Sequence, residues 1–390
     1  MSQEKNIIID DAVPYAKEIF SHLGKVKTIP GRDITQQDLV NAHALIVRSR
    51  TRVNRSLLEN TAVEFVGSTV VGLDHIDENY LNKNNISFYS AQGCNANSVA
   101  EFIINALFEL AEEFDLDLSN TTLGIIGVGN VGSKLYEKAQ KLNIKCLLND
   151  PPKQIHSPNQ TKNHPYVDLA EVLKADIISV HTPLTKTGEH STLDLIGKQQ
   201  LEKIRPDQVI INAARGGVIN ETEWVKTKTL ANIIDCWVNE PYINEELYRK
   251  AWIATPHIAG HSLDAKIAGS SMVYEALCQF WKQNSSNTWQ HHLPPPPHPI
   301  TFDNTKNTQA ALNKLFKSAH DIFLDDAEIR DKDIKKVHQK YENFRRNYPI
   351  YREWHQQKIN LTNNNVICNL LKSLGFKPSK HTKKEPTIKY

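Results

Sequence analysis

The chain has 390 residues, too many for one ordinary hydrophobic core, so two or three domains are expected. Its 46 basic and 44 acidic residues leave a net charge of +2, which gives no reason to expect nucleic acid as a partner. No apolar run approaches the roughly 20 residues of a membrane span, no signal peptide is apparent, and five cysteines without a C-x-x-C pair indicate reduced thiols in the cytoplasm.

The N-terminal part of the chain is expected to alternate strands and helices. Short apolar runs rich in β-branched residues predict strands at Ile7–Ile9, Ala44–Val47 and Glu64–Gly67, and Pro14 is placed to open a helix. This alternation is typical of a parallel sheet whose strands are connected by helices.

A long helix is expected after a turn at Gly93–Asn95. Ser98 and Glu101 have the spacing of a capping box, and apolar residues then recur with helical spacing up to Leu110. The buried strand Leu123–Ile126 follows and begins a second run of alternating strands and helices.

The segment Gly127–Gly132 has the G-x-G-x-x-G pattern of a dinucleotide-binding turn. A simple surface turn is the alternative, but here the pattern follows a predicted strand and begins an amphipathic helix. In that context Gly127 allows the tight turn, Gly129 lets a pyrophosphate approach the backbone, and Gly132 allows close packing of helix on sheet. Asp150 ends the next predicted strand, 23 residues after Gly127 (150 − 127), where an acid binds the ribose hydroxyls, which favours NAD over NADP.

Three residues suited to acid–base chemistry follow successive predicted strands further along. Arg215 follows Val209–Ile211 and can hold a carboxylate in two parallel hydrogen bonds. Glu240 follows Ile233–Asp235, and His257 follows a proline-fixed bend. A neutral histidine can take the proton of an alcohol as hydride leaves, and a neighbouring carboxylate stabilises the imidazolium. Taken singly, each residue also has a purely structural explanation: Arg215 as a surface ion-pair partner, Glu240 as an acid at a helix N-terminus and His257 as a loop histidine. The three together indicate a dehydrogenase site.

The segment Gln283–Pro299 is polar and contains four successive prolines, which predicts a semi-rigid extended linker. The region beyond it is strongly charged, has several helical patterns and ends in a lysine-rich stretch that is expected to fray. A metal site at His291, His292 and His298 has little support, because no acidic or cysteine partners accompany them.

In combination these motifs resemble the D-isomer-specific 2-hydroxyacid dehydrogenase family, over a match from Ile7 to Phe280. The residues that carry the resemblance are Gly127–Gly132 with Asp150, His181–Leu184, Asn212–Gly217, Asp235 with Glu240–Pro241, and Thr255–His257. The resemblance implies that Arg215 anchors the substrate carboxylate, that His257 is the acid/base and that Glu240 is its partner. It also implies NAD as the cofactor, bound by Gly127, Gly129, Asn130, Val131, Gly132, Asp150, Thr182, Ala213, Asp235 and Gly260.

The resemblance further implies a discontinuous α/β architecture. A Rossmann-type NAD-binding domain (96–261) is inserted in a flavodoxin-like substrate-binding domain (1–95 with 262–287), and a C-terminal α+β dimerisation domain (288–390) follows. That last domain marks one branch of the family, and the similarity to it rests on Asp325–Ala327 with Arg330 and on Phe344–Tyr348 with Arg352–Glu353. We therefore expect a homodimer formed through the C-terminal domain, with no membrane or nucleic-acid partner.

The same branch acts on a small phosphorylated 2-hydroxy acid. The residues implied to border this substrate are Arg48, Ser49, Val70 and His261. If residues 48–52 are extended, Arg48, Arg50 and Arg52 face one side and suit a phosphate; a solvated basic face is the alternative.

The chain departs from the pattern of this branch at three positions. Val70 and Leu73 stand where threonines are expected, and His261 stands where a tyrosine is expected. These changes leave the hydride machinery intact and point to a tuned or shifted recognition of the substrate tail. The rival interpretations are another dehydrogenase of the family, acting on phosphoglycerate or glycerate, and a non-enzymatic NAD-sensing corepressor.

Overall fold

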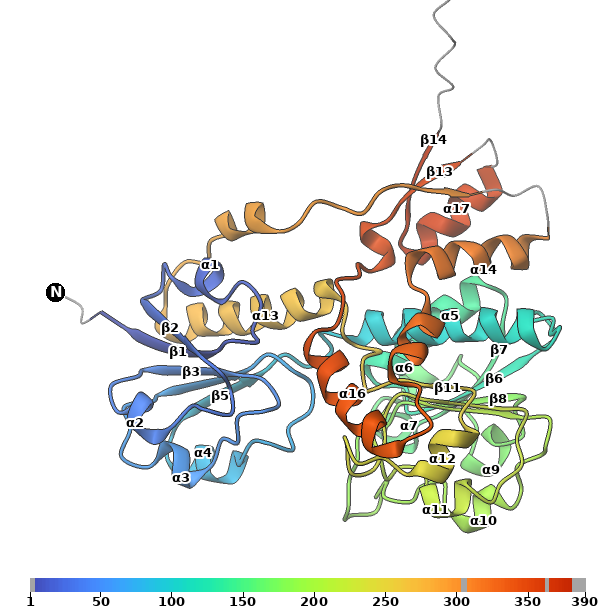
Figure 1. Ribbon diagram of the computed structural model, residues 1–390, viewed down its shortest axis with the longest axis horizontal. Coiled ribbons are helices and arrows are strands. Elements are labelled where there is room, and N and C mark those ends of the chain that lie inside the picture. Colours follow the sequence, from blue (N-terminus) through green and yellow to red (C-terminus); the bar gives the residue numbers. More distant parts are fainter. Residues whose placement is uncertain (1–3, 303–306, 362–364, 381–390) are drawn as a thin grey trace, which may run out of the picture. The chain divides into compact units, whose positions relative to one another are not determined.

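The computed structural model describes residues 4–302, 307–361 and 365–380, and the chain forms two compact units (Figure 1). One unit consists of Met1–Ala96 and Ser262–Pro295, and the other of Asn97–His261 and Pro296–Tyr390. Most of the lysine-rich end that is expected to fray, residues 381–390, lies outside the described residues. Among the helices that the structure describes, none has the length and apolar character needed to cross a membrane.

The first unit is built on a parallel five-stranded sheet. Its strands pair in the order β2-β1-β3-β4-β5, which is the order of a flavodoxin-like sheet and confirms that prediction. The strands are β1 (Asn6–Asp10), β2 (Lys25–Ile29), β3 (Ala44–Val47), β4 (Phe65–Ser68) and β5 (Ser87–Ser90). The helices of this unit are α1 (Ala16–Phe20), α2 (Gln36–Leu39), α3 (Arg55–Leu58), α4 (Glu78–Lys83) and α13 (Leu263–Trp281).

Both faces of this sheet are buried, which explains the continuous apolar runs of its central strands. Ile7 and Ile9 lie in one core with Val273 of α13, whereas Ile8 and Leu45 lie in the opposite core. The three predicted strands are confirmed as β1, β3 and β4. The edge strands β2 and β5 are only partly buried, so they lack the apolar runs that predicted the others.

The second unit contains a parallel six-stranded sheet, with the order β11-β10-β9-β8-β6-β7. An isolated parallel bridge between Leu148 and Tyr166 adds a rudimentary strand beyond β7 and completes the doubly wound order of a dinucleotide-binding sheet. The strands are β6 (Thr122–Ile126), β7 (Lys145–Asn149), β8 (Ile177–Val180), β9 (Val209–Asn212), β10 (Ala231–Ile234) and β11 (Ile253–Ala254). Its helices are α5 (Ala96–Glu113), α6 (Asn130–Lys141), α7 (Pro151–His156), α8 (Pro158–Thr161), α9 (Leu169–Val172), α10 (Lys198–Leu201), α11 (Glu221–Trp224) and α12 (Glu245–Lys250).

Helix α5 begins earlier than expected. Because Ala96 is already helical, Ser98 is an internal residue and the predicted capping box with Glu101 is wrong. Ser98 Oγ instead donates to the carbonyl of Ala259 at 2.8 Å, and Glu101 accepts from the backbone N–H of Trp354 at 3.0 Å. Both side chains thus connect α5 to segments that are distant in the sequence.

The C-terminal region combines helices with a three-stranded parallel sheet, in the order β12-β13-β14. Its core is aromatic: the Trp354 ring stacks with centroids 4.5 Å from Phe316 and 4.9 Å from Phe376, and Phe316 meets Phe108 of α5 edge-on. Its elements are β12 (Ile300–Phe302), α14 (Thr308–Ala319), α15 (Ile322–Ile329), α16 (Ile334–Arg346), η2 (Trp354–Gln356), β13 (Lys358–Leu361), α17 (Asn365–Leu374) and β14 (Lys377–Lys380).

The proline-rich segment is not an extended linker throughout, so that prediction is partly wrong. Residues Thr288–His292 form a 3₁₀ turn, η1, and Trp289 is buried in the core of the first unit with Tyr274 and Leu277. Proline content predicts stiffness, but it does not reveal that one tryptophan anchors the segment.

Candidate active site

The glycine loop joins β6 to α6 and has the geometry of a phosphate-binding turn. Gly127 has φ +86°, and a Cβ atom on Gly132 would lie 2.1 Å from the Gly127 carbonyl oxygen, so helix and loop approach too closely for a side chain. A Cβ atom on Gly129, by contrast, would meet nothing within 4 Å. The backbone at Gly129 is therefore open, and Asn130 and Val131 follow it in the first turn of α6, where backbone N–H groups have no intrahelical acceptor and can bind an anion.

Asp150 lies beside this loop, as predicted. Its Oδ2 accepts from the Val128 N–H at 2.8 Å and its Oδ1 accepts from the Lys153 N–H at 3.0 Å. The Lys153 ammonium, which sequence reasoning missed, donates to the Val128 carbonyl at 2.7 Å and to Ser133 Oγ at 3.3 Å. One carboxylate and one ammonium thus border the glycine loop.

Thr182 and Ala213 follow β8 and β9, on the same edge of the sheet as the glycine loop. Thr182 packs so closely on the loop that a Cβ atom on Gly127 would lie 2.8 Å from its methyl group. Its buried hydroxyl has no hydrogen-bond partner among the described residues. Because β6 and β8 are neighbours at the point where the winding of the sheet reverses, this edge is the usual crevice for a dinucleotide. The open backbone, the ribose acid and the unsatisfied hydroxyl fit NAD.

Glu240 and His257 form a close pair. Nδ1 of His257 lies 3.0 Å from both carboxylate oxygens of Glu240, and the backbone of His257 is left-handed, with φ +56°. Burial alone would raise the pKa of Glu240, but the charge and hydrogen bond of His257, together with Arg345, lower it to about 2. Because Glu240 is ionised, Nδ1 carries the hydrogen and Nε2 is left to exchange a proton with a substrate.

Asp235 holds the loop that carries His257. Its Oδ1 accepts from Thr255 Oγ1 and from the Ile258 N–H, both at 2.7 Å, and its Oδ2 accepts from the Ala259 N–H at 3.2 Å. Burial raises the pKa of Asp235, although these hydrogen bonds and His257 act in the opposite direction. The predicted Gly260 follows directly at the end of this loop. Asp235 therefore holds the chain on both sides of His257, through the Thr255 hydroxyl before it and two backbone N–H groups after it.

Arg215 lies in the loop after β9, held there by Asn212. The side chain of Asn212 donates to the carbonyls of Arg215 at 3.1 Å and of Cys236 at 3.2 Å, and the Arg215 guanidinium donates to the Ala214 carbonyl at 2.7 Å. Burial raises the pKa of the Cys236 thiol well above its usual value, and Arg215 is one of the charges that oppose this shift.

Cys236 was not predicted, yet it lies at the centre of this set. Its sulfur and the nearest side-chain ligand atoms of Glu240 and His257 all lie within 4.8 Å of one another. The structure thus brings Glu240 and His257 beside one buried thiol, and Arg215 acts on that thiol electrostatically. A thiol that stays protonated adds no charge of its own to the proton transfer.

The residues predicted for the substrate tail do not all lie in one unit. Arg48, Ser49 and Val70 follow the paired strands β3 and β4 of the first unit, whereas His261 belongs to the second. The chain turns at Ser49–Arg50, with the Thr51 N–H donating to the Arg48 carbonyl at 3.4 Å. The prediction that alternate arginines of an extended segment face one side is therefore wrong.

Lys266 of α13 is a further basic residue near Arg48 that the sequence did not single out. Burial, and then the charge of Arg48, lower the pKa of Lys266 to about 8. The Arg48 guanidinium also donates to the Ala12 carbonyl at 3.0 Å, and its backbone N–H donates to Asp10 at 3.3 Å. Two cations therefore act on each other at the carboxyl edge of the first sheet.

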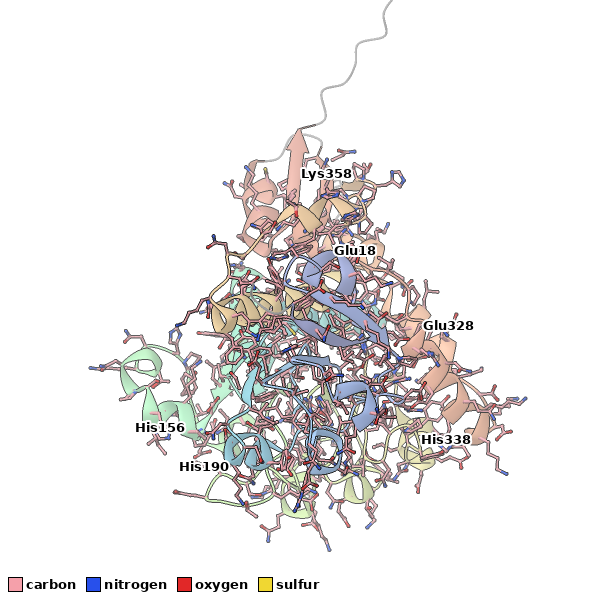
Figure 2. All side chains as sticks on the ribbon, turned by 90° about the vertical axis from the view of Figure 1, so that its left-hand side faces the viewer. Glu18, His156, His190, Glu328, His338 and Lys358 are labelled. Carbon is pink, nitrogen blue, oxygen red and sulfur yellow. The ribbon has the colours of Figure 1, made fainter. Side chains whose placement is uncertain are left out.

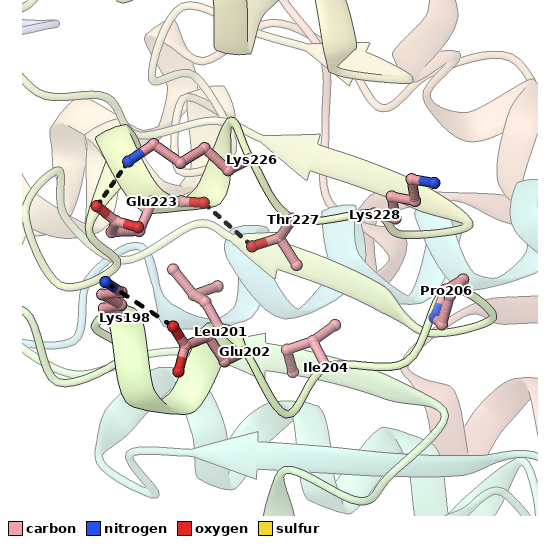
Figure 3. Close-up of a pocket in the computed structure, with 9 residues that line it drawn as sticks. All are labelled: Lys198, Leu201, Glu202, Ile204, Pro206, Glu223, Lys226, Thr227 and Lys228. Carbon is pink, nitrogen blue, oxygen red and sulfur yellow. Dashed lines mark hydrogen bonds and ion pairs between the residues drawn. The ribbon is translucent and has the colours of Figure 1, made fainter.

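A pocket in the second unit lies over α10 and α11 and has a different character (Figure 3). Four of its charged side chains pair with one another, Lys226 with Glu223 at 2.9 Å and Lys198 with Glu202 at 4.0 Å. None of the predicted site residues lines it.

The sheet, the glycine loop and the Glu240–His257 pair define an NAD-binding dehydrogenase domain. Residues 105–259 match the family model described as D-isomer specific 2-hydroxyacid dehydrogenase, NAD binding domain. Residues 292–375 match a second model, described as a domain of unknown function (DUF3410).

Full-length relatives narrow the class further. The chain is 54% identical to an erythronate-4-phosphate dehydrogenase of Hydrogenovibrio crunogenus over 96% of this chain and 99% of the relative. It is 48% identical to one of Ruthia magnifica over 90% and 97% of the two chains. The chain belongs to the erythronate-4-phosphate dehydrogenase family, a branch of the D-isomer-specific 2-hydroxyacid dehydrogenases. The fold is also that of an NAD⁺-bound 3-phosphoglycerate dehydrogenase of Entamoeba histolytica, with TM-score 0.60, 24% identity and coverage of 72% of this chain and 96% of that one.

Proposed function

We propose that the protein oxidises 4-phospho-D-erythronate to 2-oxo-3-hydroxy-4-phosphobutanoate with NAD, a step of pyridoxal 5′-phosphate biosynthesis. The observation that carries the proposal is the Glu240–His257 pair, 3.0 Å apart and downstream of an open glycine loop, in a chain whose full-length relatives bear this enzyme's name. NAD, when bound, supplies the acceptor for the hydride from C2 of the substrate.

The roles of the chain's own residues follow from their chemistry. Nε2 of His257 takes the proton of the C2 hydroxyl, and the ionised Glu240 stabilises the imidazolium that forms. Arg215 binds the substrate carboxylate through its planar fork. We assign Asp150 to the ribose hydroxyls, Thr182, Asp235 and Gly260 to the nicotinamide side, and Ala213 to the cofactor site.

The substrate phosphate is assigned to the cations of the first unit. Arg48 and Lys266 act on each other electrostatically, and an anion between them would relieve their repulsion and stabilise both charges. Ser49, Val70 and His261 are assigned to the rest of the substrate tail.

Rates of NAD reduction with three acids test this function. The protein is incubated with 4-phosphoerythronate, unphosphorylated erythronate and 3-phosphoglycerate, and 2-oxo acids are tested with NADH in the reverse direction. The proposal predicts the highest kcat/KM for 4-phosphoerythronate. Turnover of 3-phosphoglycerate alone would assign the chain to a different reaction of the same chemistry.

We also propose that the protein is a cytoplasmic homodimer. The C-terminal region exposes the large apolar side chains of Leu324 (66%), Ile350 (70%) and Val366 (77%), which a second copy of the chain could cover. The five cysteines, all within the described part of the chain, form no disulfide there, which suits a reducing compartment. Light scattering of the purified chain, with Ile350→Lys as a variant that should weaken association, tests the dimer.

A further inference from the structure

Helix α16 of the C-terminal region presents two residues to the Glu240–His257 pair. Tyr341 and Arg345 are four residues apart and therefore share one face of the helix. Nη1 of Arg345 lies 3.9 Å from Oε2 of Glu240, whose carboxylate is also 3.0 Å from Nδ1 of His257. The carboxylate thus has a cationic neighbour that comes from outside the NAD-binding domain.

The surroundings of Glu240 strengthen its electrostatic interaction with Arg345. Its side chain is only 20% exposed, and Tyr341 is buried with a hydroxyl that has no hydrogen-bond partner among the described residues. Charges interact more strongly where water is excluded. The titratable and charged groups that act on Glu240, or on which it acts, are His257, Arg345, Glu221, Tyr341 and Cys236, while Asp235 interacts with His257. Among them Arg345 is the permanent cation.

The position of α16 is fixed by a polar anchor at the edge of the sheet. Asp326 of α15 accepts from the backbone N–H of Ala254 in β11 at 2.6 Å, three residues before His257 (257 − 254). Arg330 binds Asp326 at 2.8 Å and donates to the carbonyls of Tyr248 at 3.1 Å and Ala251 at 2.8 Å.

Aromatic packing holds the same face of α16 one turn before Tyr341, since His338 and Tyr341 are three residues apart. His338, which is labelled in Figure 2, packs edge-on against Tyr242 with ring centroids 5.3 Å apart. Tyr242 lies two residues after Glu240. Helix α16 is therefore tied to the segments that carry both members of the pair.

We propose that Arg345 is a positioning residue for the Glu240–His257 pair and that the C-terminal domain of unknown function completes the active site through it. By sharing the carboxylate with the histidine, Arg345 limits how strongly Glu240 stabilises the imidazolium. The inference rests on the proposed role of His257.

The test compares Arg345→Gln and Arg345→Lys with Arg346→Gln, a neighbouring but exposed arginine on the same helix. The readout is kcat/KM for oxidation as a function of pH. Without Arg345, Glu240 should stabilise the imidazolium of His257 more strongly. The acid limb of the profile of Arg345→Gln should therefore lie at a pH higher by about one unit. Arg345→Lys should retain much of the wild-type pH profile. The profile of the control Arg346→Gln should coincide with that of the wild type. A uniform loss across all pH values, with the acid limb unmoved, would overturn the proposal.

A double variant shows whether the effect passes through Glu240. In a Glu240→Gln background, Arg345→Gln should shift the acid limb no further, because the shared carboxylate is gone. If Arg345→Gln shifted the acid limb as much in the Glu240→Gln background as in the wild type, the proposal would be wrong. Thermal melting and NAD titration of each variant identify any that fail to fold, in which case Arg345→Lys and Arg345→Met carry the comparison.

A second readout does not depend on turnover. In protein labelled with ¹⁵N-histidine, the His257 ring signals are assigned by their loss in His257→Asn. Their titration midpoint should move to higher pH in Arg345→Gln, and an unchanged midpoint contradicts the inference even if no acid is turned over. Failure of the proposed function is a separate outcome: 4-phosphoerythronate would then not be oxidised, whereas the effect of Arg345→Gln on the His257 signals would still be measurable.

Discussion

The Lys138 ammonium lies 3.5 Å from the Glu101 carboxylate, and these side chains are only 8% and 6% exposed. Lys138 also donates to the Leu374 carbonyl at 3.0 Å and lies over the ring of Trp354. Lys138 belongs to α6, the helix that begins at the glycine loop, and Glu101 belongs to α5. The buried pair therefore connects both helices to the C-terminal region.

Replacing Lys138 by Met should destabilise the protein by roughly 1–3 kcal/mol, because the buried Leu374 carbonyl and the buried carboxyl group of Glu101 both lose a hydrogen-bond donor. Lys141→Met is the matched control on the same helix. Lys141 is exposed and makes one hydrogen bond to the Ser373 carbonyl at 2.8 Å, so its loss should cost at most about 1 kcal/mol. Urea unfolding measures the free energy of unfolding of both variants. Equal losses would show that the buried pair contributes no more to stability than the exposed lysine does.

The pH dependence of stability should report on Glu101. Burial raises its pKa from the ordinary 4.5 to about 8, against the opposing effect of Lys138. Between these values the folded protein keeps a proton that the unfolded chain has released, so stability declines as the pH rises through this window. Glu101→Gln cannot release the proton, and its urea midpoint should decline less between about pH 5 and about pH 8. Parallel curves for the two proteins would contradict the expectation.

Replacing His257 by Asn should lower kcat by about 10²–10⁴-fold, because the proton acceptor is lost. Asparagine tolerates the left-handed backbone at this position, φ +56°, so the loop should keep its shape. NAD affinity should change little. His190→Asn, an exposed histidine labelled in Figure 2, is the control and should behave as wild type. Stopped-flow or steady-state NADH absorbance supplies the rates, and turnover that survives in His257→Asn would refute the assignment.

Two glycines of the same loop should respond in opposite ways. Gly129→Ala places a methyl group in open space, so stability should stay within about 1 kcal/mol while NAD binds about tenfold or more weakly. Gly132→Ala would bring Cβ within 2.1 Å of the Gly127 carbonyl oxygen and should destabilise the fold by more than about 2 kcal/mol. Thermal melting and NAD fluorescence titration separate the two effects. Tight NAD binding by Gly129→Ala would mean that the cofactor does not approach the loop there.

Removing the ammonium of Lys266 should affect only phosphorylated substrates. In Lys266→Met, KM for 4-phosphoerythronate should rise about tenfold or more, because a charge-assisted contact to the phosphate is lost. Activity on unphosphorylated erythronate should be unchanged. Lys17→Met, on the exposed face of α1, controls for the general loss of positive charge. A parallel rise in KM for both acids would assign Lys266 a structural role instead.

Local patterns made the nucleotide side of the site predictable. The glycine loop, Asp150 and the residues after β8 and β9 each follow a buried strand, and the sheet brings such strand ends to one edge. The same reasoning predicted Arg215, Glu240 and His257 as a group. The pairing of Glu240 with His257 depends only on segments of the same sheet, so it could be inferred from order along the chain.

Contacts across long sequence distances were not predictable. Arg345 reaches Glu240 only because Asp326 and Arg330 attach α15 to the edge strand β11, which no local pattern encodes. Ser98 matched a capping motif, yet its hydroxyl bonds to Ala259, 161 residues away. A motif this short can occur by chance, and tertiary packing then decides which contacts its residues make.

The anchor at β11 also bears on solubility. A strand at the rim of a sheet offers unpaired backbone groups to any other strand, and Asp326 occupies the Ala254 N–H that would otherwise be offered. Ile329, Val337 and Tyr341 cover apolar side chains of the adjoining core. An NAD-binding fragment without its C-terminal region would expose the edge strand β11 together with an apolar patch. We expect such a fragment to self-associate. The domain of unknown function thus serves as a cap against aggregation as well.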